Sequence, residues 1–244
     1  MPSPLKYFCV LICLMMQAQV LSAQGKKLTA GSDTSFWYRD MLKNVAKLNL
    51  PNLKQSATGH QWRMWFDGQV TSYVLIIHPA ESQLILYTQE YEDPLTGQPS
   101  NRIFVKAYAL SRLQAKGIDS LKEAYGIDQI PTDEQIKGWG DIMGLDGVTY
   151  LMEKTDDTTY SFKHYWTPSA IKTDEAKKMT GFIAATEQLI GYQHFDTDFM
   201  KSIPFLSYFT GGPLLGMKAL PRKEARRLRK ARKAYLKSHP EISK

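Results

Sequence analysis

The chain has 244 residues and a formal net charge of +7. The excess of positive charge lies at the C-terminal end, because residues 221–244 hold ten Lys/Arg and two Glu, whereas residues 24–220 hold 20 basic and 22 acidic residues. Both cysteines, Cys9 and Cys13, lie within the first 23 residues. The rest of the chain therefore has no disulfide, thiolate metal site or cysteine nucleophile.

The first 23 residues have the order of a secretory signal peptide. A short segment with one lysine precedes a ten-residue apolar run at 7–16, and a stretch that ends in Ser22-Ala23 follows it. The run is shorter than the roughly 20 residues that a membrane-spanning helix needs. We predict cleavage after Ala23 or Ser22 and a secreted or periplasmic location; the alternative is an uncleaved anchor.

Residues 24–220 are long enough to form a single domain with its own core. Apolar residues recur every three or four positions in 35–48, which predicts an amphipathic helix that ends before Pro51. Strand patterns follow at 61–67, 71–77, 83–91 and 102–110. Their short links predict an antiparallel meander.

The second half of the domain alternates between helix and hairpin patterns. We predict helices at 113–125 and 173–190, ended by Gly126 and Gly191, and a short helix after Pro131. Residues 147–166 alternate large apolar and polar side chains around a polar turn, the clearest hairpin in the chain. Asp196, Thr197 or Asp198 is expected to cap a further segment. The sum is an α+β fold: a curved antiparallel sheet of about six strands with helices packed on one face.

The end of the hairpin also carries a family resemblance. The sequence YSFKHYWTPSA at 160–170, together with the earlier tryptophan-rich WRMWF, resembles uncharacterised secreted proteins of Bacteroidota type. The resemblance covers at most residues 61–170. It implies a location in the cell envelope, and it identifies no active-site residues.

Few residues suggest catalysis. His164 lies on an aromatic strand face and is a candidate for a general base, since histidine is the residue type whose ordinary pKa lies near working pH; the alternative is a histidine of the core. Glu90, Glu92 and Asp93 form the densest acidic group, and Glu90 and Glu92 would share a strand face. Paired carboxylates can cleave glycosides, although a solvated strand end explains them as well.

Cofactor and metal motifs are missing from the sequence. His194, Asp196 and Asp198 alternate as three possible ligands, but neither a calcium-loop nor a zinc-helix spacing is present. No phosphate-binding glycine loop occurs either. We therefore expect no cofactor and no metal, and we assign the two aspartates to helix capping.

Trp65 and the C-terminal tail are the candidate binding residues. Trp65 lies opposite Trp62, Met64 and Phe66 on its strand, so either both faces of the sheet are covered or Trp65 is an exposed aromatic for binding. The residues after Pro221 predict either a basic, weakly amphipathic helix or a solvated tail. Its candidate contacts with an anionic surface are Arg226, Arg227, Arg229, Lys230, Arg232 and Lys233.

These features predict a non-enzymatic binding or structural module of the cell envelope. Its tail would contact an anionic membrane surface or lipopolysaccharide, and nucleic acid is not an expected partner of a secreted chain. Two alternatives remain open: an envelope hydrolase acting on a glycan or ester, and a carrier of an apolar ligand on the concave face of the sheet.

Overall fold

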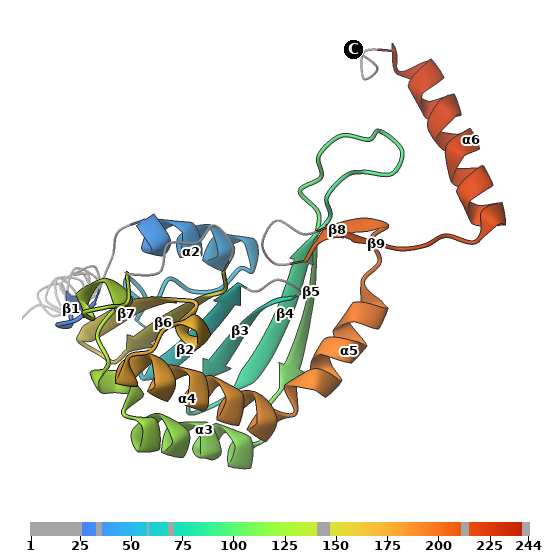
Figure 1. Ribbon diagram of the computed structural model, residues 1–244. Coiled ribbons are helices and arrows are strands. Elements are labelled where there is room, and N and C mark those ends of the chain that lie inside the picture. The colour runs from blue at the N-terminus through green and yellow to red at the C-terminus, as the bar shows by residue number, and fades with distance from the viewer. Residues whose placement is uncertain are drawn as a thin grey trace, which may run out of the picture.

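The computed structural model describes residues 26–32, 36–57, 59–67, 71–140, 147–210 and 215–240, and the predicted signal peptide lies outside these ranges. The described residues form an α+β fold around a curved seven-stranded sheet, with the strand order β1-β7-β6-β2-β3-β4-β5 (Figure 1). The predicted fold class is confirmed.

The strands of this sheet are β1 (Lys27–Leu28), β2 (Gln61–Asp67), β3 (Ser72–Ile77), β4 (Gln83–Gln89), β5 (Ile103–Ala109), β6 (Thr149–Thr155) and β7 (Thr159–Trp166). The α-helices are α2 (Phe36–Lys47), α3 (Arg112–Tyr125), α4 (Asp174–Ile190), α5 (Tyr192–Ser202) and α6 (Arg222–Ser238). Three 3-10 turns, η1 (Ile127–Gln129), η2 (Asp133–Gln135) and η3 (Pro168–Ala170), and a small hairpin of β8 (Ser207–Phe209) and β9 (Leu215–Met217) complete the fold.

Strand pairing follows the sequence pattern. Strands β2 to β5 form the predicted antiparallel meander, and β6 and β7 form the predicted hairpin, with Thr155 opposite Tyr160 at its turn. The Asp156 carboxylate holds this turn, because Oδ1 accepts the backbone N–H groups of Thr158 at 2.8 Å and Thr159 at 2.6 Å. β1 adds to the edge of β7 in parallel, a pairing that its two-residue length gave no means to predict.

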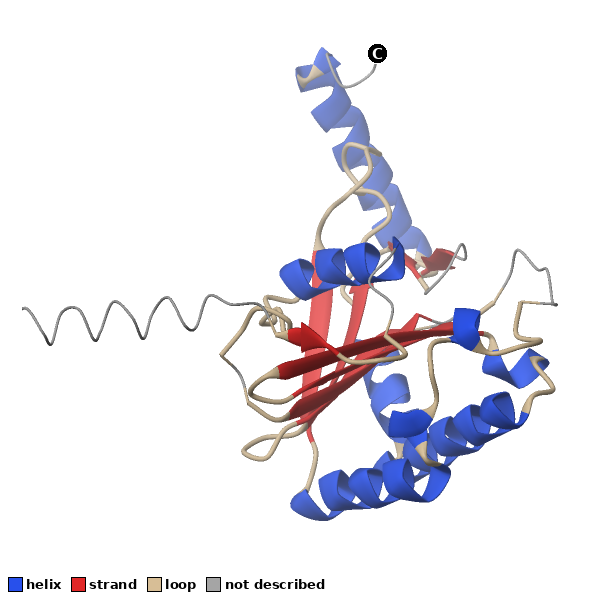
Figure 2. Ribbon diagram, turned by 90° about the vertical axis from the view of Figure 1, so that its left-hand side faces the viewer, coloured by secondary structure: helices blue, strands red, loops and turns tan. Residues whose placement is uncertain are grey.

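Both faces of the sheet are covered, as Figures 1 and 2 show. Helices α3, α4 and α5 lie on one face, where Trp62 and Met64 of β2 share a core with Phe182 of α4. Helix α2 adds a layer on the opposite face, where Met41 packs in a second core with Trp65. Alternation along β2 therefore sends side chains into two separate cores.

The helix ends follow local capping rules. Ser111 opens α3 with a capping box, and Gly126 and Gly191 end α3 and α4 with φ of 63° and 70°, which only glycine adopts readily. The expected short helix after Pro131 is instead the 3-10 turn η2. The cap expected at 196–198 is wrong, because α5 begins at Tyr192 and those residues lie inside it.

Side chains close most of the outer edge of β7. Beyond the two residues of β1, three side-chain oxygens accept hydrogen bonds from the N–H groups of this edge. Ser32 accepts from Phe162 at 3.3 Å, Thr132 from His164 at 3.1 Å, and Asp133 from Trp166 at 2.9 Å. An open strand edge is a template for pairing with another chain. In this sheet, short polar side chains occupy that template.

Candidate functional site

His164 lies on β7 under helix α2, paired with an acid that the sequence did not reveal. Its Nδ1 lies 3.0 Å from Oδ2 of Asp133 in η2, and the ring of Trp37 stacks on the imidazole at 4.4 Å. The Nε2 atom is buried and has no hydrogen-bond partner among the described residues. An Asp–His pair can orient an imidazole for base catalysis. Here, however, His164 is 4% exposed and Asp133 is 6% exposed, so the pair joins η2 to the sheet inside the protein.

Glu90 follows β4 and is fully engaged in an ion pair. The guanidinium of Arg102 holds both its oxygens, with Nε at 2.7 Å and Nη2 at 2.5 Å, and the Ser100 hydroxyl donates a further bond at 2.5 Å. The Glu90 side chain is 1% exposed. Bidentate Arg–carboxylate pairs fix geometry, so Glu90 anchors the base of the loop between β4 and β5.

The other two acids also have structural contacts, and Asp93 lies 3.8 Å from the same Arg102. Asp93 accepts backbone N–H bonds from Leu95 and Thr96 within its loop, and Glu92 lies 3.8 Å from Arg232 of α6. Strands β7 and β4 are four positions apart in the sheet, about 19 Å at the usual strand spacing. The structure therefore does not bring His164 together with the Glu90 and Glu92 group.

Trp65 is not an exposed binding aromatic, and that prediction is wrong. The residue is 3% exposed beneath α2, and its indole N–H donates to Glu153 Oε2 at 2.7 Å. The Tyr160 hydroxyl donates to the other oxygen of Glu153, also at 2.7 Å. Of the two interpretations of β2, the covered second face is the correct one.

The candidate ligands around His194 are spread along α5. Asp196 accepts a bond from Thr71, and Asp198 accepts one from Tyr108 at 2.7 Å and pairs with Lys106 at 2.6 Å. The hydrogen bonds from Lys106 and Tyr108 lower the pKa of Asp198. Within the described ranges, no group of three His, Cys, Asp or Glu side chains is placed to hold a metal ion.

Helix α6 carries all six basic residues proposed for surface contact. It spans 17 residues, about 25 Å, and stands away from the body beside the loop between β4 and β5 (Figures 1 and 2). Nine Lys/Arg and one Glu lie in it, and none of its residues is buried. A Cβ atom at Gly97, whose φ is 71°, would collide with the Arg232 guanidinium, so the helix approaches this loop closely.

An exposed apolar surface lies next to α6, on the hairpin of β8 and β9. The hairpin β8–β9 buries Tyr208 on one side, and on the other side it exposes Phe209, Leu215 and Met217, the last by 81%. Tyr91 packs edge-on against Phe209 at 5.5 Å and extends this surface. We call these four residues the apolar face. Alternation around Tyr208 was a signal for a strand, but the break at 211–213 hid the second strand.

No known protein family matches the chain, and no curated protein matches it either. Among solved structures, it is similar to a protein from Bacillus halodurans described as a "putative adenylate cyclase", with 13% identity over 83% of this chain and 98% of that chain. The TM-score of 0.20 is too low to support any argument about fold or function.

Proposed function

We propose that the protein is a secreted or periplasmic binding module of the cell envelope that rests on an anionic membrane surface through α6 and the apolar face. The observation that carries this proposal is α6 itself: a helix with nine basic residues, one acidic residue and no buried side chain. A helix in water gains most of its stability from packing. Within the described chain, α6 contacts the loop between β4 and β5 through Arg232, and its unburied side chains leave most of its surface free for a partner.

The basic side chains of α6 and the exposed side chains of the apolar face favour binding to the headgroup region of a lipid bilayer. Each Lys or Arg near an anionic leaflet contributes about 1 kcal/mol, and exposed apolar side chains add shallow burial at the interface. The apolar stripe of α6 is thin, so α6 should lie on the surface. None of the helices in the described ranges has the length and apolar character needed to cross a bilayer.

The proposal predicts salt-sensitive binding to vesicles. The chain from Gln24 onward should co-sediment with vesicles of 30% phosphatidylglycerol in phosphatidylcholine, and the R226Q/R229Q/K233Q variant should bind on the order of 100-fold more weakly at low salt, from three charges at about 1 kcal/mol each. The matched control K172Q/K177Q/K178Q removes the same charge from exposed sites that precede or lie within α4. It should bind like the wild type.

The apolar face has its own matched pair. Changing Leu215 and Met217 to serine should remove much of the binding that persists in 0.5 M salt, whereas Leu113→Ser, which alters an 82% exposed leucine on α3, should not. Equal binding by the α6 variant and its control would refute the proposal. Binding to lipopolysaccharide but not to phosphatidylglycerol would reassign the surface, and equal binding to duplex DNA would show that charge alone directs α6.

A further inference from the structure

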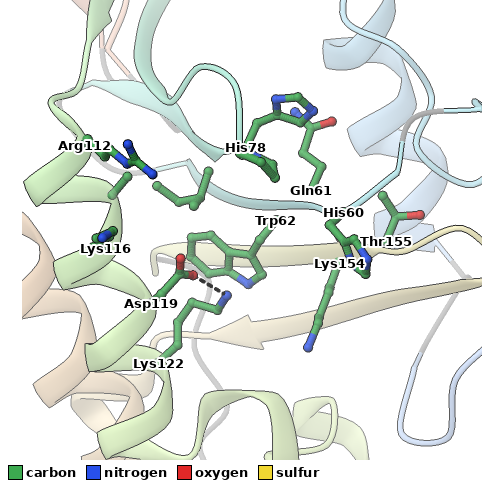
Figure 3. A pocket seen from close by; sticks show the side chains of 13 residues that line it. His60, Gln61, Trp62, His78, Arg112, Lys116, Asp119, Lys122, Lys154 and Thr155 are labelled. Carbon is green, nitrogen blue, oxygen red and sulfur yellow. Dashed lines mark hydrogen bonds and ion pairs between the residues drawn. The ribbon is translucent and has the colours of Figure 1, made fainter.

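A cleft of 360 Å³ lies at the end of the sheet where β2 begins and β3 and β6 end, facing one side of α3 (Figure 3). It is separate from α6 and from the apolar face. Its floor is Trp62, with the Lys122 ammonium 5.1 Å from the centre of the indole ring. This volume is at the lower end of the range for small-molecule pockets.

The walls of the cleft are strongly basic. From α3 come Arg112, Lys116 and Lys122. They share one helix face with Ala115 and Asp119, because these lining positions are linked by steps of three or four residues. From the opposite side come the remaining basic side chains, His60, His78 and Lys154. Asp119 is the acid among the lining residues.

Two of the four Lys/Arg cations have nearby acids, and two do not. Lys122 lies 3.2 Å from Asp119, and Lys154 pairs with Asp128. Arg112 and Lys116, by contrast, have no ion pair or side-chain hydrogen bond with any described residue, and both are exposed. The cleft therefore keeps two uncompensated positive charges at its mouth.

This placement is unfavourable for the helix by itself. Like charges at positions i and i+4 destabilise a helix, and cations near a helix N-terminus oppose its dipole. The first turn of α3 contains Arg112 and no acid. The helix dipole also gives the N-terminal end of α3 a positive potential that attracts anions. An anion bound at the cleft would therefore offset both the repulsion between Arg112 and Lys116 and the unfavourable position of Arg112 in the dipole.

We propose that this cleft binds the phosphate group of a small phosphorylated molecule. Arg112 can hold two phosphate oxygens with its planar fork, Lys116 adds a point charge one turn along, and His60 and His78 can donate from the opposite wall. The rest of the ligand would lie over Trp62 and Lys122. The phosphate belongs to a soluble phosphomonoester or to a phosphomonoester lipid headgroup, and the experiment separates these sources.

Titration calorimetry of the full chain tests the soluble source. Glycerol 3-phosphate should bind, and glycerol, which lacks the phosphate, should not. The R112Q/K116Q variant should bind at least 30-fold more weakly, from two lost charge-assisted contacts. The control K172Q/K178Q removes equal charge from exposed positions away from the cleft and should leave affinity unchanged. Unchanged circular dichroism and a melting temperature that does not fall would show that the exposed substitutions keep the fold.

Vesicles of phosphatidic acid in phosphatidylcholine test the lipid source. Both variant pairs are compared in the R226Q/R229Q/K233Q background, so that a contribution from α6 does not mask the cleft. Binding to either source that R112Q/K116Q weakens and K172Q/K178Q does not would support the proposal. Equal weakening by both pairs would overturn it, and so would the absence of binding to both glycerol 3-phosphate and these vesicles. Neither result bears on the role proposed for α6.

Discussion

Glu153 offers a test of how the second core of the protein is held together. Its side chain is 1% exposed and accepts hydrogen bonds from the Trp65 indole and the Tyr160 hydroxyl, each at 2.7 Å. The Arg63 guanidinium, which is fully buried, lies 3.7 Å away. Burial raises the pKa of Glu153, and Arg63 offsets this only in part. The acceptor oxygens should therefore matter more to stability than the negative charge.

Two substitutions separate these contributions. Glu153→Leu removes both oxygens and leaves the donors of Trp65 and Tyr160 buried without partners, about 1–3 kcal/mol each, in addition to an unpaired Arg63. We expect a loss of about 4 kcal/mol or more. Glu153→Gln keeps one acceptor but also leaves Arg63 without its carboxylate partner, so it should lose less than Glu153→Leu, about 2–3 kcal/mol. The first loss is a large share of the roughly 5–15 kcal/mol that holds a typical protein folded.

Urea unfolding followed by circular dichroism gives both free energies of unfolding. A loss of less than 1 kcal/mol for Glu153→Leu, or equal losses for the two variants, would refute the assignment of Glu153 as the acceptor of this core. The pH dependence of the free energy of unfolding gives an independent test. Because the folded pKa is raised above the ordinary 4.5, the wild type loses stability as pH rises from that value through the folded pKa. Glu153→Gln lacks this loss, so its deficit should narrow as pH rises.

Three further predictions concern single contacts. Asp156→Ala should destabilise the protein by about 1–3 kcal/mol in urea unfolding at pH 7. Hydrogen bonds from Thr159 and Thr158 lower the pKa of Asp156, so the stability difference between the variant and the wild type should disappear as pH falls below 3.8 through the folded pKa. A difference that stays constant with pH would contradict this. Asp133→Ala should cost at least 2 kcal/mol in the same assay, because it leaves the buried His164 imidazole and the partly buried Trp166 N–H without their partner. A neutral result would remove its role at the β7 edge. Gly97→Ala should raise protease cleavage in the loop between β4 and β5, because of its φ of 71° and the adjacent Arg232, while leaving global stability within about 0.5 kcal/mol.

Local sequence patterns predicted where the helices and strands lie better than they predicted which other elements cover them. Alternation located β2, β6 and β7, and glycines located the ends of α3 and α4. The same alternation placed Trp65 opposite Trp62 but held no information on whether a helix covers that side. Coverage depends on α2 folding back across the sheet, which is a tertiary event.

The candidate sites show the same limit. The basic residues of α6 are contiguous, so composition was enough to find them. The basic cleft instead joins His60, His78 and Arg112 from separate elements, and only the register of the strands and the docking of α3 bring them together. Glu90 and His164 looked equally promising as isolated residues. Their neighbours Arg102 and Asp133, which lie 12 and 31 positions away along the chain, give both of them structural contacts.

The closure of the β7 edge gives the position of the predicted N-terminal cleavage a structural meaning. Strand β1 begins four residues after Ala23, and the N–H groups of Lys27 and Thr29 donate to the carbonyls of Thr158 and Tyr160, each at 2.9 Å. A protease that trimmed the chain past Thr29 would remove these donors and leave the first residues of β7 as an open strand edge. Such a segment recruits strands from other copies. The first few residues after the predicted cleavage site therefore cover an edge to which a second copy of the chain could otherwise pair.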